Sequence, residues 1–435
     1  MTDRWDFTRH SQSRFAWTCV GIALGIVLTV VATTLSGVVS RTHTLEKGPI
    51  TILSGRDDSI GGQRQQLIDQ WNRLHPESPA RIVELPGLAD AQRSEMLARA
   101  QSGRGDIDVY NLDVTWIAEF AEAGYIRALD ESTIDTAGFL PAPLETCRYR
   151  GKLWALPFNT DVGLLYYRTD LITEPPRTWD ELEDQVEEHR RRSGGAVDGY
   201  LGQFDDYEGL TVTALEVVAG TRRSIVADTG EIVQIADRDA VTAGLERLRA
   251  IAPRRDPQTG AAGVPALDET DAVRAFRAGS AAFMRNWPVA YRSLERNLEG
   301  RQTVPFAVAP LPNNAGVLGG QNLAVAADTK RPRAAQALIE FLTSDHSQQI
   351  LFERGGLPAT RAVVYHDEAV RERYPYVTTL ENALREATVR PTLTRYARFS
   401  ETFRGVVDAV LRGGQPVPED LSERLADARR GKITS

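Results

Sequence analysis

Short apolar runs alternate with amphipathic stretches through the first third of the chain. The apolar runs at 50–53, 81–85 and 107–112 have the length of strands, and apolar positions recur at helical spacing in 67–74 and 94–101. Strand followed by helix in this rhythm favours a mostly parallel sheet with helices on its faces. We therefore expect an α/β protein.

Acidic residues follow two of these predicted strands directly. Asp57 and Asp58 come after the first strand, and Asp113 closes the third, three residues ahead of Trp116. In parallel sheets, ligands bind beyond the carboxyl ends of the strands. These residues are therefore candidate ligand contacts, with a solvated loop as the alternative for Asp57 and Asp58.

Residues 151–171 contain two short apolar runs separated by the polar sequence Asn159-Thr160-Asp161. Pro157 has no backbone N–H and is expected to end the first strand, while residues 164–167 form the second. We interpret this stretch as a crossing between two lobes, which places the polar step in the cleft between them.

The second half of the chain adds an aromatic corner and a pair of glycines. Residues 281–284 predict a buried strand that leads to Trp287, and Gly319 and Gly320 precede another apolar strand. Paired glycines let backbone amides approach a ligand closely. Residues 193–209 are rich in Gly and Asp and are expected to form a loop at the rim of the cleft.

The order of these motifs resembles that of the family 1 extracellular solute-binding proteins, the sugar-capturing subunits of ABC importers. The resemblance covers residues 50–425 and is carried by GK-L-x-x-LPFNTD-x-G-L-x-YYR-x-DL (151–171), D-x-x-W (113–116), Trp287-Pro288, GG-x-NLAV (319–325) and Arg390-Pro391. It implies a two-lobe periplasmic-binding-protein fold of type II. Each lobe is then a mostly parallel sheet flanked by helices, with the ligand cleft between the lobes.

The resemblance also implies roles for individual residues. Asp161 lends its carboxylate to the ligand, Trp287 stacks on a sugar ring, and Arg390 hydrogen-bonds the ligand. Sugars present many hydroxyls and one apolar ring face, so their sites combine carboxylates, amides and Arg with an aromatic side chain. The candidate ligand-binding residues are Asp57, Asp58, Asp113, Trp116, Asn159, Asp161, Trp287, Gly320, Gln321 and Arg390. For Trp287, a plain place in the core is the alternative.

The N-terminus carries a separate apolar stretch. Residues 1–14 are polar and basic, and residues 15–39 contain no charge. The apolar stretch exceeds the roughly 20 residues that span a bilayer, and the basic flank precedes it, so the positive-inside rule places the bulk of the chain outside. We expect a single-pass signal-anchor helix in the cell membrane, with a cleaved signal peptide and a buried soluble helix as alternatives. No cysteine closes the run, because Cys19 lies near its start.

These patterns divide the chain into seven predicted segments. They are a cytoplasmic N-terminus (1–14), a transmembrane helix (15–39), a linker (40–49), lobe 1 (50–160), lobe 2 (161–303), a return segment to lobe 1 (304–355) and C-terminal helices that complete the lobes, mainly lobe 2 (356–435).

Charge and motifs exclude several function classes. A net charge of −8 argues against nucleic acid as a partner, and six scattered histidines lack metal-ligand spacing, so no metal or cofactor is expected. No nucleophile-elbow, P-loop or HExxH motif is present. We expect a monomeric binding protein, not an enzyme, that takes up a carbohydrate and delivers it to a membrane permease with a separate ATPase. A membrane-anchored sugar sensor and a sugar-cleaving enzyme with paired carboxylates are the alternatives.

Overall fold

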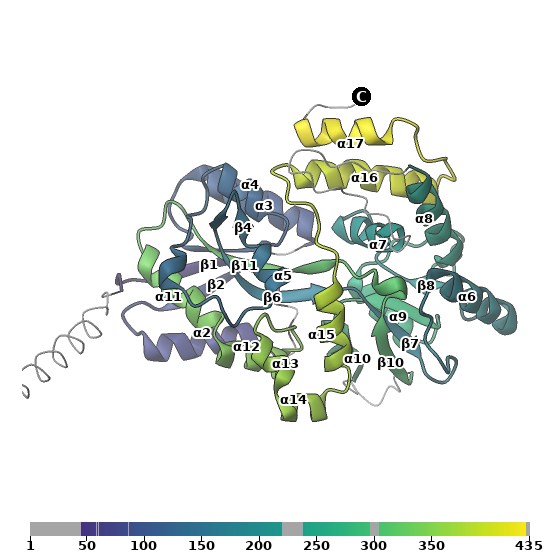
Figure 1. The fold of residues 1–435 in the computed structure, drawn as a ribbon, viewed down its shortest axis with the longest axis horizontal. Coiled ribbons are helices and arrows are strands. Elements are labelled where there is room, and N and C mark those ends of the chain that lie inside the picture. Colours follow the sequence, from purple (N-terminus) through teal and green to yellow (C-terminus); the bar gives the residue numbers. More distant parts are fainter. Residues whose placement is uncertain are drawn as a thin grey trace, which may run out of the picture. The chain divides into compact units, whose positions relative to one another are not determined.

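The computed structural model describes residues 45–57, 59, 61–85, 87–219, 238–295 and 304–431. The predicted transmembrane helix at 15–39 lies outside these residues. Within the described part of the chain, no helix combines the length and the apolar character needed to cross a membrane. From Lys47 onward the chain forms one unit that contains two sheets, each with its own helices (Figure 1).

The sheet of lobe 1 has five strands in the order β2-β1-β3-β11-β6. The strands are β1 (Ile50–Gly55), β2 (Ala80–Leu85), β3 (Val109–Asp113), β6 (Leu156–Val162) and β11 (Leu318–Val325). Strand β1 is parallel to β2 and β3, whereas β11 is antiparallel to both β3 and β6. Strand β11 therefore brings a late segment of the chain between two early ones.

Helices cover both faces of this sheet, with α3 and α4 on one side and α2 and α12 on the other (Figure 1). The helices of lobe 1 are α2 (Gln63–Leu74), α3 (Ala89–Ser102), α4 (Ile117–Glu122), α5 (Pro141–Glu145), α11 (Pro332–Leu342) and α12 (Asp345–Ile350). Leu67, Ile68 and Trp71 are the buried apolar side chains of α2, as expected, but Leu74 at the end of the predicted stripe is 61% exposed. Shorter elements are the 3₁₀ helix η1 (Glu131–Thr133), the hairpin of β4 (Arg148–Tyr149) and β5 (Lys152–Leu153), and the π-helix η3 (Leu351–Gly355).

The sheet of lobe 2 has four strands in the order β10-β7-β9-β8. They are β7 (Leu164–Arg168), β8 (Tyr200–Leu201), β9 (Phe283–Asn286) and β10 (Phe306–Pro310), and η2 (Pro312–Asn314) follows β10. Strand β7 is antiparallel to β9 and β10, and β8 and β9 alone pair in parallel in this sheet. The expectation of a mostly parallel sheet is therefore wrong for lobe 2, and in lobe 1 it holds only for β1, β2 and β3, since both pairings of β11 are antiparallel. The reason is that β7 arrives from lobe 1 while its neighbour β10 leads back to it.

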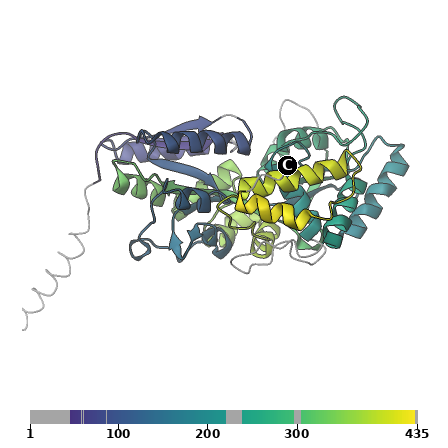
Figure 2. The same cartoon turned by 90° about the horizontal axis from the view of Figure 1, so that it is seen from above.

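Helices from distant parts of the chain enclose this second sheet. They are α6 (Trp179–Ser193), α7 (Glu208–Ala219), α8 (Arg238–Ile251), α9 (Glu269–Arg277), α10 (Val289–Glu295), α13 (Ala362–His366), α14 (Glu368–Arg373), α15 (Val377–Glu386), α16 (Tyr396–Leu411) and α17 (Leu421–Arg430). The buried side chains of α13 to α17 join the apolar core of lobe 2. Helices α16 and α17 lie together over α7 and α8 (Figures 1 and 2).

The crossing at 151–171 differs from its sequence-based interpretation. Strand β6 continues through Asn159 to Val162, and Gly163 alone separates it from β7. Pro157 does not end the strand, because β6 is an edge strand that pairs only with β11 and has a register shift opposite Pro157. The polar residues are therefore held on a regular strand and not on a loop.

The expectation of a rim loop at 193–209 is also corrected. Tyr200 lies in strand β8, and its side chain and that of Phe204 have no solvent exposure. Both aromatic rings belong to the core of lobe 2. Aromatic residues among Gly and Asp thus mark a buried segment here.

Gly320 is the position where β11 and β6 approach most closely. Its φ is +119°, and a Cβ there would lie 2.4 Å from the Asn159 carbonyl oxygen. We expect Gly320→Ala to lower the free energy of unfolding by about 2–4 kcal/mol, through backbone strain and overpacking. Urea denaturation measures this change.

Gly405 provides the matched control, because it is exposed within α16 and has open space around its Cα. Gly405→Ala should leave stability unchanged or raise it by about 0.5–1 kcal/mol, since Ala favours helix over Gly. An equal effect of the two substitutions would contradict the close approach of β11 to β6.

Candidate functional site

Strand pairing gathers predicted site residues from three segments at the carboxyl end of β3. Gln321 on β11 lies opposite Asp113 on one side and opposite Asn159 on the other. Gly319 lies opposite Asp161. Residues as far apart in sequence as Asp113 and Gln321 therefore form one surface, because β11 is inserted between β3 and β6.

The polar side chains on this surface form short hydrogen-bond networks in which some acceptor atoms have no partner. Asn159 Nδ2 donates to Asp161 Oδ2 at 3.1 Å, and Asn159 is only 5% exposed. Asn159 Oδ1 is buried and has no hydrogen-bond partner in the protein. Asn111 Nδ2 on β3 donates to Gln321 Oε1 at 3.0 Å, and Asn111 Oδ1 is likewise unpaired. Buried acceptors of this kind are favourable positions for donors of a ligand, because leaving them unpaired costs free energy.

Trp287 reaches the same surface from lobe 2. A Cβ added at Gly319 would lie 3.1 Å from its Cζ3 atom, so the indole edge packs against this glycine. The guanidinium carbon of Arg285 lies 3.8 Å from the ring centroid and covers one face of the ring. Trp287 Nε1 donates to Glu269 Oε1 at 3.1 Å. These contacts fix the ring and leave its opposite face as the one that can stack on a ligand.

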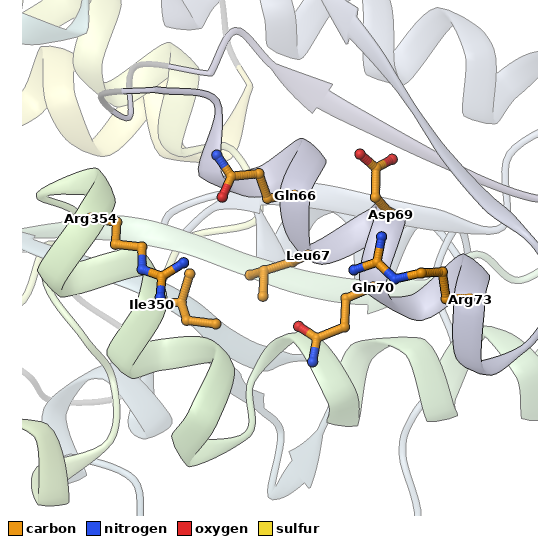
Figure 3. A pocket seen from close by; sticks show the side chains of 7 residues that line it. All are labelled: Gln66, Leu67, Asp69, Gln70, Arg73, Ile350 and Arg354. Carbon is orange, nitrogen blue, oxygen red and sulfur yellow. The ribbon is translucent and has the colours of Figure 1, made fainter.

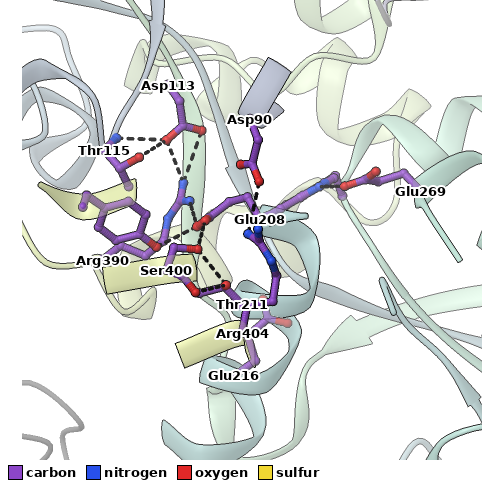
Figure 4. Close-up of polar contacts among 12 residues, drawn as sticks. Asp90, Asp113, Thr115, Glu208, Thr211, Glu216, Glu269, Arg390, Ser400 and Arg404 are labelled. Carbon is purple, nitrogen blue, oxygen red and sulfur yellow. Dashed lines mark hydrogen bonds and ion pairs between the residues drawn. The ribbon is translucent and has the colours of Figure 1, made fainter. Parts of the chain in front are cut away.

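Arg390 connects the two lobes through a pair of carboxylates (Figure 4). Its Nη1 donates to Glu208 Oε1 at 2.8 Å in lobe 2, and its Nη2 donates to Asp113 Oδ1 at 3.2 Å in lobe 1. The Arg390 side chain is 3% exposed, and its Nε has no hydrogen-bond partner in the protein. Burial alone would lower the pKa of Arg390. The acidic groups beside it, Asp113, Tyr396 and Glu208, together have a larger opposite effect, so the net shift of the pKa is upward. The guanidinium therefore stays charged.

The carboxylates beside Arg390 are held by hydroxyl groups. Glu208 Oε1 accepts from Tyr396 Oη at 2.6 Å, and its other oxygen accepts from Ser400 Oγ. Asp113 Oδ1 accepts from the backbone N–H of Thr115 at 2.9 Å and from its hydroxyl at 2.7 Å. Burial raises the pKa of Glu208, and the charge of Arg390 opposes that shift. Each carboxylate is thus positioned before any ligand enters.

The remaining predicted residues have local partners. Asp57 Oδ1 lies 3.0 Å from Arg64 Nε and accepts from Ser59 N–H at 2.9 Å, so this carboxylate is engaged by its own loop and α2. Trp116 is 7% exposed and lies at the start of α4. Asp58 lies outside the described residues.

Sequence reasoning missed four charged residues that border the site, namely Glu208, Glu216, Glu269 and Arg285. A pattern in the sequence could have indicated two of them. Glu216 is the one acidic residue in the otherwise apolar and hydroxyl-bearing stretch 210–219, and Arg285 follows the apolar run 281–284. A charge inside an apolar element requires a buried partner of opposite sign.

A hollow lies on lobe 1, apart from the surface of β6 and β11 (Figure 3). It has a volume of about 220 Å³ and is lined by Gln66, Leu67, Asp69, Gln70, Arg73, Ile350 and Arg354. None of the predicted ligand-binding residues is among these, so the hollow is not the candidate site.

Comparison with known proteins identifies the family. Residues 83–376 match the model of the family described as bacterial extracellular solute-binding protein. A protein of Deinococcus radiodurans named "Probable ABC transporter-binding protein" is 30% identical over 376 residues, which cover 81% of this chain and 87% of that protein. The chain therefore belongs to the bacterial extracellular solute-binding proteins.

Solved structures agree with this assignment. The maltose-bound MalE3 protein of T. maritima superimposes with a TM-score of 0.76 and 28% identity, covering 88% of this chain and 99% of that one. The GacH receptor of Streptomyces glaucescens, solved without ligand and with acarbose, superimposes with a TM-score of 0.73 and 26% identity. The match covers 89% of this chain and 98% of that one. The predicted family and the two-lobe α/β periplasmic-binding-protein fold are confirmed. Because the family captures solutes for ABC transporters and performs no chemistry on them, this protein is not an enzyme.

Arg390 generates a stability prediction. Arg390→Met removes the cation between Asp113 and Glu208, and we expect it to lower the free energy of unfolding by about 3–5 kcal/mol because two carboxylates lose their partner. Adding Glu208→Gln to this variant should restore part of the loss. Urea denaturation of the ligand-free protein measures both.

The control is Arg398→Met on the neighbouring helix, since Arg398 and its partner Glu401 are 65% and 62% exposed. An exposed pair contributes about 1 kcal/mol or less. Equal losses from Arg390→Met and Arg398→Met would show that Arg390 does not join the lobes as described.

Proposed function

We propose that this protein captures a carbohydrate, a di- or oligosaccharide, between its two lobes and delivers it to the membrane permease of an ABC importer. The observation that carries the proposal is the meeting of Trp287 with the polar surface of β6 and β11. One aromatic face and several fixed hydrogen-bonding groups come together there from different lobes. A separate ATPase subunit would drive the import step.

The chemistry of this surface suits a sugar. The face of Trp287 that Arg285 does not cover would supply apolar area for the C–H face of a pyranose ring. The indole ring is already immobilised, which limits the entropy lost on binding. Asp161 and the unpaired Oδ1 of Asn159 accept hydrogen bonds from hydroxyl groups, each contributing about 0.5–1.5 kcal/mol, and more for the charged acceptor. Gly320 stays a predicted backbone contact, next to Asn159, whose carbonyl oxygen fills the space that a Cβ of residue 320 would take.

The remaining predicted contacts extend this surface. Asp113, Gln321 and Arg390 lie at its border and would meet a second sugar ring, and Arg390 Nε has a free donor. The solved relatives named for bound maltose and acarbose support a ligand with more than one ring. Asp57, Asp58 and Trp116 stay predictions at its edge. Closure of two lobes over the ligand is a hinge motion that removes water from these hydrogen bonds.

We further propose that the apolar stretch at 15–39 anchors the protein in the cell membrane, with the solute-binding part on the extracellular side. The length and lack of charge of the stretch support an uncleaved helix. An anchor of this kind keeps the captured sugar close to the permease and raises its effective concentration there.

The sugar proposal predicts ligand-dependent stabilisation. We expect one member of a panel of mono-, di- and oligosaccharides to raise the melting temperature, with about 2.7 kcal/mol of stabilisation at a hundred times its Kd. Asp161→Ala and Trp287→Ala should abolish the shift, and calorimetric titration should give the same order of affinities. The exposed Asp420, whose side chain is 50% accessible, provides the control variant Asp420→Ala, which should bind as the wild type does.

Two results would contradict this proposal. If no sugar raises the melting temperature, the proposal of a carbohydrate ligand is wrong, and polyols and peptides are the next ligands to test. Recovery of cleaved sugar after incubation would show an enzyme instead.

The anchor proposal predicts that the full-length chain fractionates with membranes and resists extraction by alkaline carbonate. A chain that begins at residue 46 and follows an unrelated cleavable signal should be recovered in the soluble fraction. An intact mass that shows cleavage near residue 40 would contradict the anchor and support a signal peptide.

A further inference from the structure

The most deeply buried charges of the protein form one ion pair next to the crossing strands. Arg285 and Glu216 both have no solvent exposure, and the two N–H···O contacts between them, Nε to Oε2 and Nη2 to Oε1, are each 2.7 Å. Arg285 Nη1 also donates to Gln203 Oε1 at 2.7 Å. Neither residue belongs to a family motif named above, and neither contributes an atom to the surface of β6 and β11.

Glu216 contacts the first two of the three connections between the lobes. The first crossing is Gly163, between β6 and β7, and a Cβ added there would lie 2.0 Å from Glu216 Oε1. The second crossing runs from β10 to β11, and Val317, one residue before β11, donates its N–H to the same oxygen at 3.2 Å. One carboxylate oxygen therefore packs against the first connection and hydrogen-bonds to the second.

Arg285 extends the same chain of contacts to the ligand surface. Its guanidinium covers one face of Trp287 at 3.8 Å, while the Trp287 carbonyl oxygen accepts from Tyr166 Oη at 2.9 Å. Tyr166 lies on β7, two residues after the crossing has entered lobe 2. The path from hinge to aromatic ring thus consists of Gly163, Glu216, Arg285 and Trp287, each in contact with the next.

We propose that Glu216 and Arg285 are positioning residues that couple the angle between the lobes to the placement of Trp287. A change of backbone angles at Gly163 or Val317 moves the carboxylate, the carboxylate moves the guanidinium, and the guanidinium shifts the indole ring that stacks on the ligand. Lobe closure and stacking then share one coupling free energy, and each favours the other. The part of the inference that concerns the ligand rests on the proposed function, whereas the coupling from hinge to ring does not.

The geometry favours this role over simple stabilisation. A buried ion pair contributes little net stability relative to apolar residues of the same volume, because desolvation of both charges offsets their attraction. What such a pair provides is a fixed geometry, since each charge must keep its partner. A fixed geometry between the hinge and the aromatic ring is what a closing protein requires.

The coupling is tested first without any ligand. We would label the seven tryptophans of the full-length protein with 5-fluorotryptophan and assign the Trp287 resonance by Trp287→Phe. Gly163→Ala alters the first crossing at a residue that does not itself contact the Trp287 ring. If the coupling exists, this substitution should still shift the Trp287 resonance. The double variant Gly163→Ala/Arg285→Met should show the same Trp287 resonance as the single variant Arg285→Met. Absence of a shift, or a shift that persists without Arg285, would overturn the coupling.

A second arm uses the sugar identified by thermal shift. In the wild-type background, we expect Glu216→Gln and Arg285→Lys each to raise the Kd for this sugar about tenfold. In a Trp287→Ala background, the same substitutions should raise the Kd less than about twofold. The titrations extend to sugar concentrations that saturate the weaker binder. A merely structural role would produce equal losses in both backgrounds, which would overturn the proposal. If the wild type binds no sugar, the proposed function fails, and the fluorine experiment alone decides the coupling.

The matched control is another buried arginine of lobe 2. Arg190 is 6% exposed in its side chain and pairs with Asp198 at 2.6 Å, far from both crossings along the chain. Arg190→Lys should lower the melting temperature without moving the Trp287 resonance or the Kd. A change of either quantity in this variant would show that loss of stability, and not loss of coupling, explains the effects at Glu216 and Arg285.

Discussion

Two buried guanidinium groups set the geometry on which the candidate site depends. Arg285 is fully buried against Glu216, and Arg390 is 3% exposed between Asp113 and Glu208. A charge removed from water must keep an opposite charge beside it, because separation of a buried pair costs several kcal/mol. Each arginine therefore fixes the elements that supply its carboxylates. The Arg285 pair lies within lobe 2, whereas the carboxylates of Arg390 come from both lobes, Asp113 from lobe 1 and Glu208 from lobe 2.

Backbone pairing supplies the second constraint, because β6 is an edge strand and still must satisfy its polar groups. A side chain of α12 and the backbone of the segment that follows this helix take the place of a neighbouring strand. Gln348 Nε2 donates to the Phe158 carbonyl at 2.6 Å, and Thr160 N–H donates to the Pro358 carbonyl at 3.2 Å. An edge covered in this way is protected from pairing with another chain. It also holds Asn159 and Asp161 in a rigid strand, where their positions vary little.

Much of the fold and part of the site could be predicted from the sequence. The stripe of α2 and the strand that leads to Trp287 both depend on residues close together in the chain, and the structure contains both. The partners of buried charges could not be predicted in the same way. Glu216 and Arg285 are 69 residues apart, and Glu208 and Arg390 are 182 apart, so no spacing rule connects them. The direction of strands in lobe 2 was missed for a similar reason, since it depends on where the chain returns from lobe 1.

The same contacts that immobilise Trp287 also decide how it can be used. With Arg285 on one face and Gly319 at one edge, only the opposite face of the ring is left for stacking. The surface of β6 and β11 also holds Asn159 Oδ1, an acceptor that the protein leaves without a partner despite the free energy this costs. Proteins retain such unfavourable local features mainly where function requires them. An aromatic ring and an unpaired acceptor beside the same strands suit a ligand that has both an apolar face and hydroxyl donors, and a sugar ring has both.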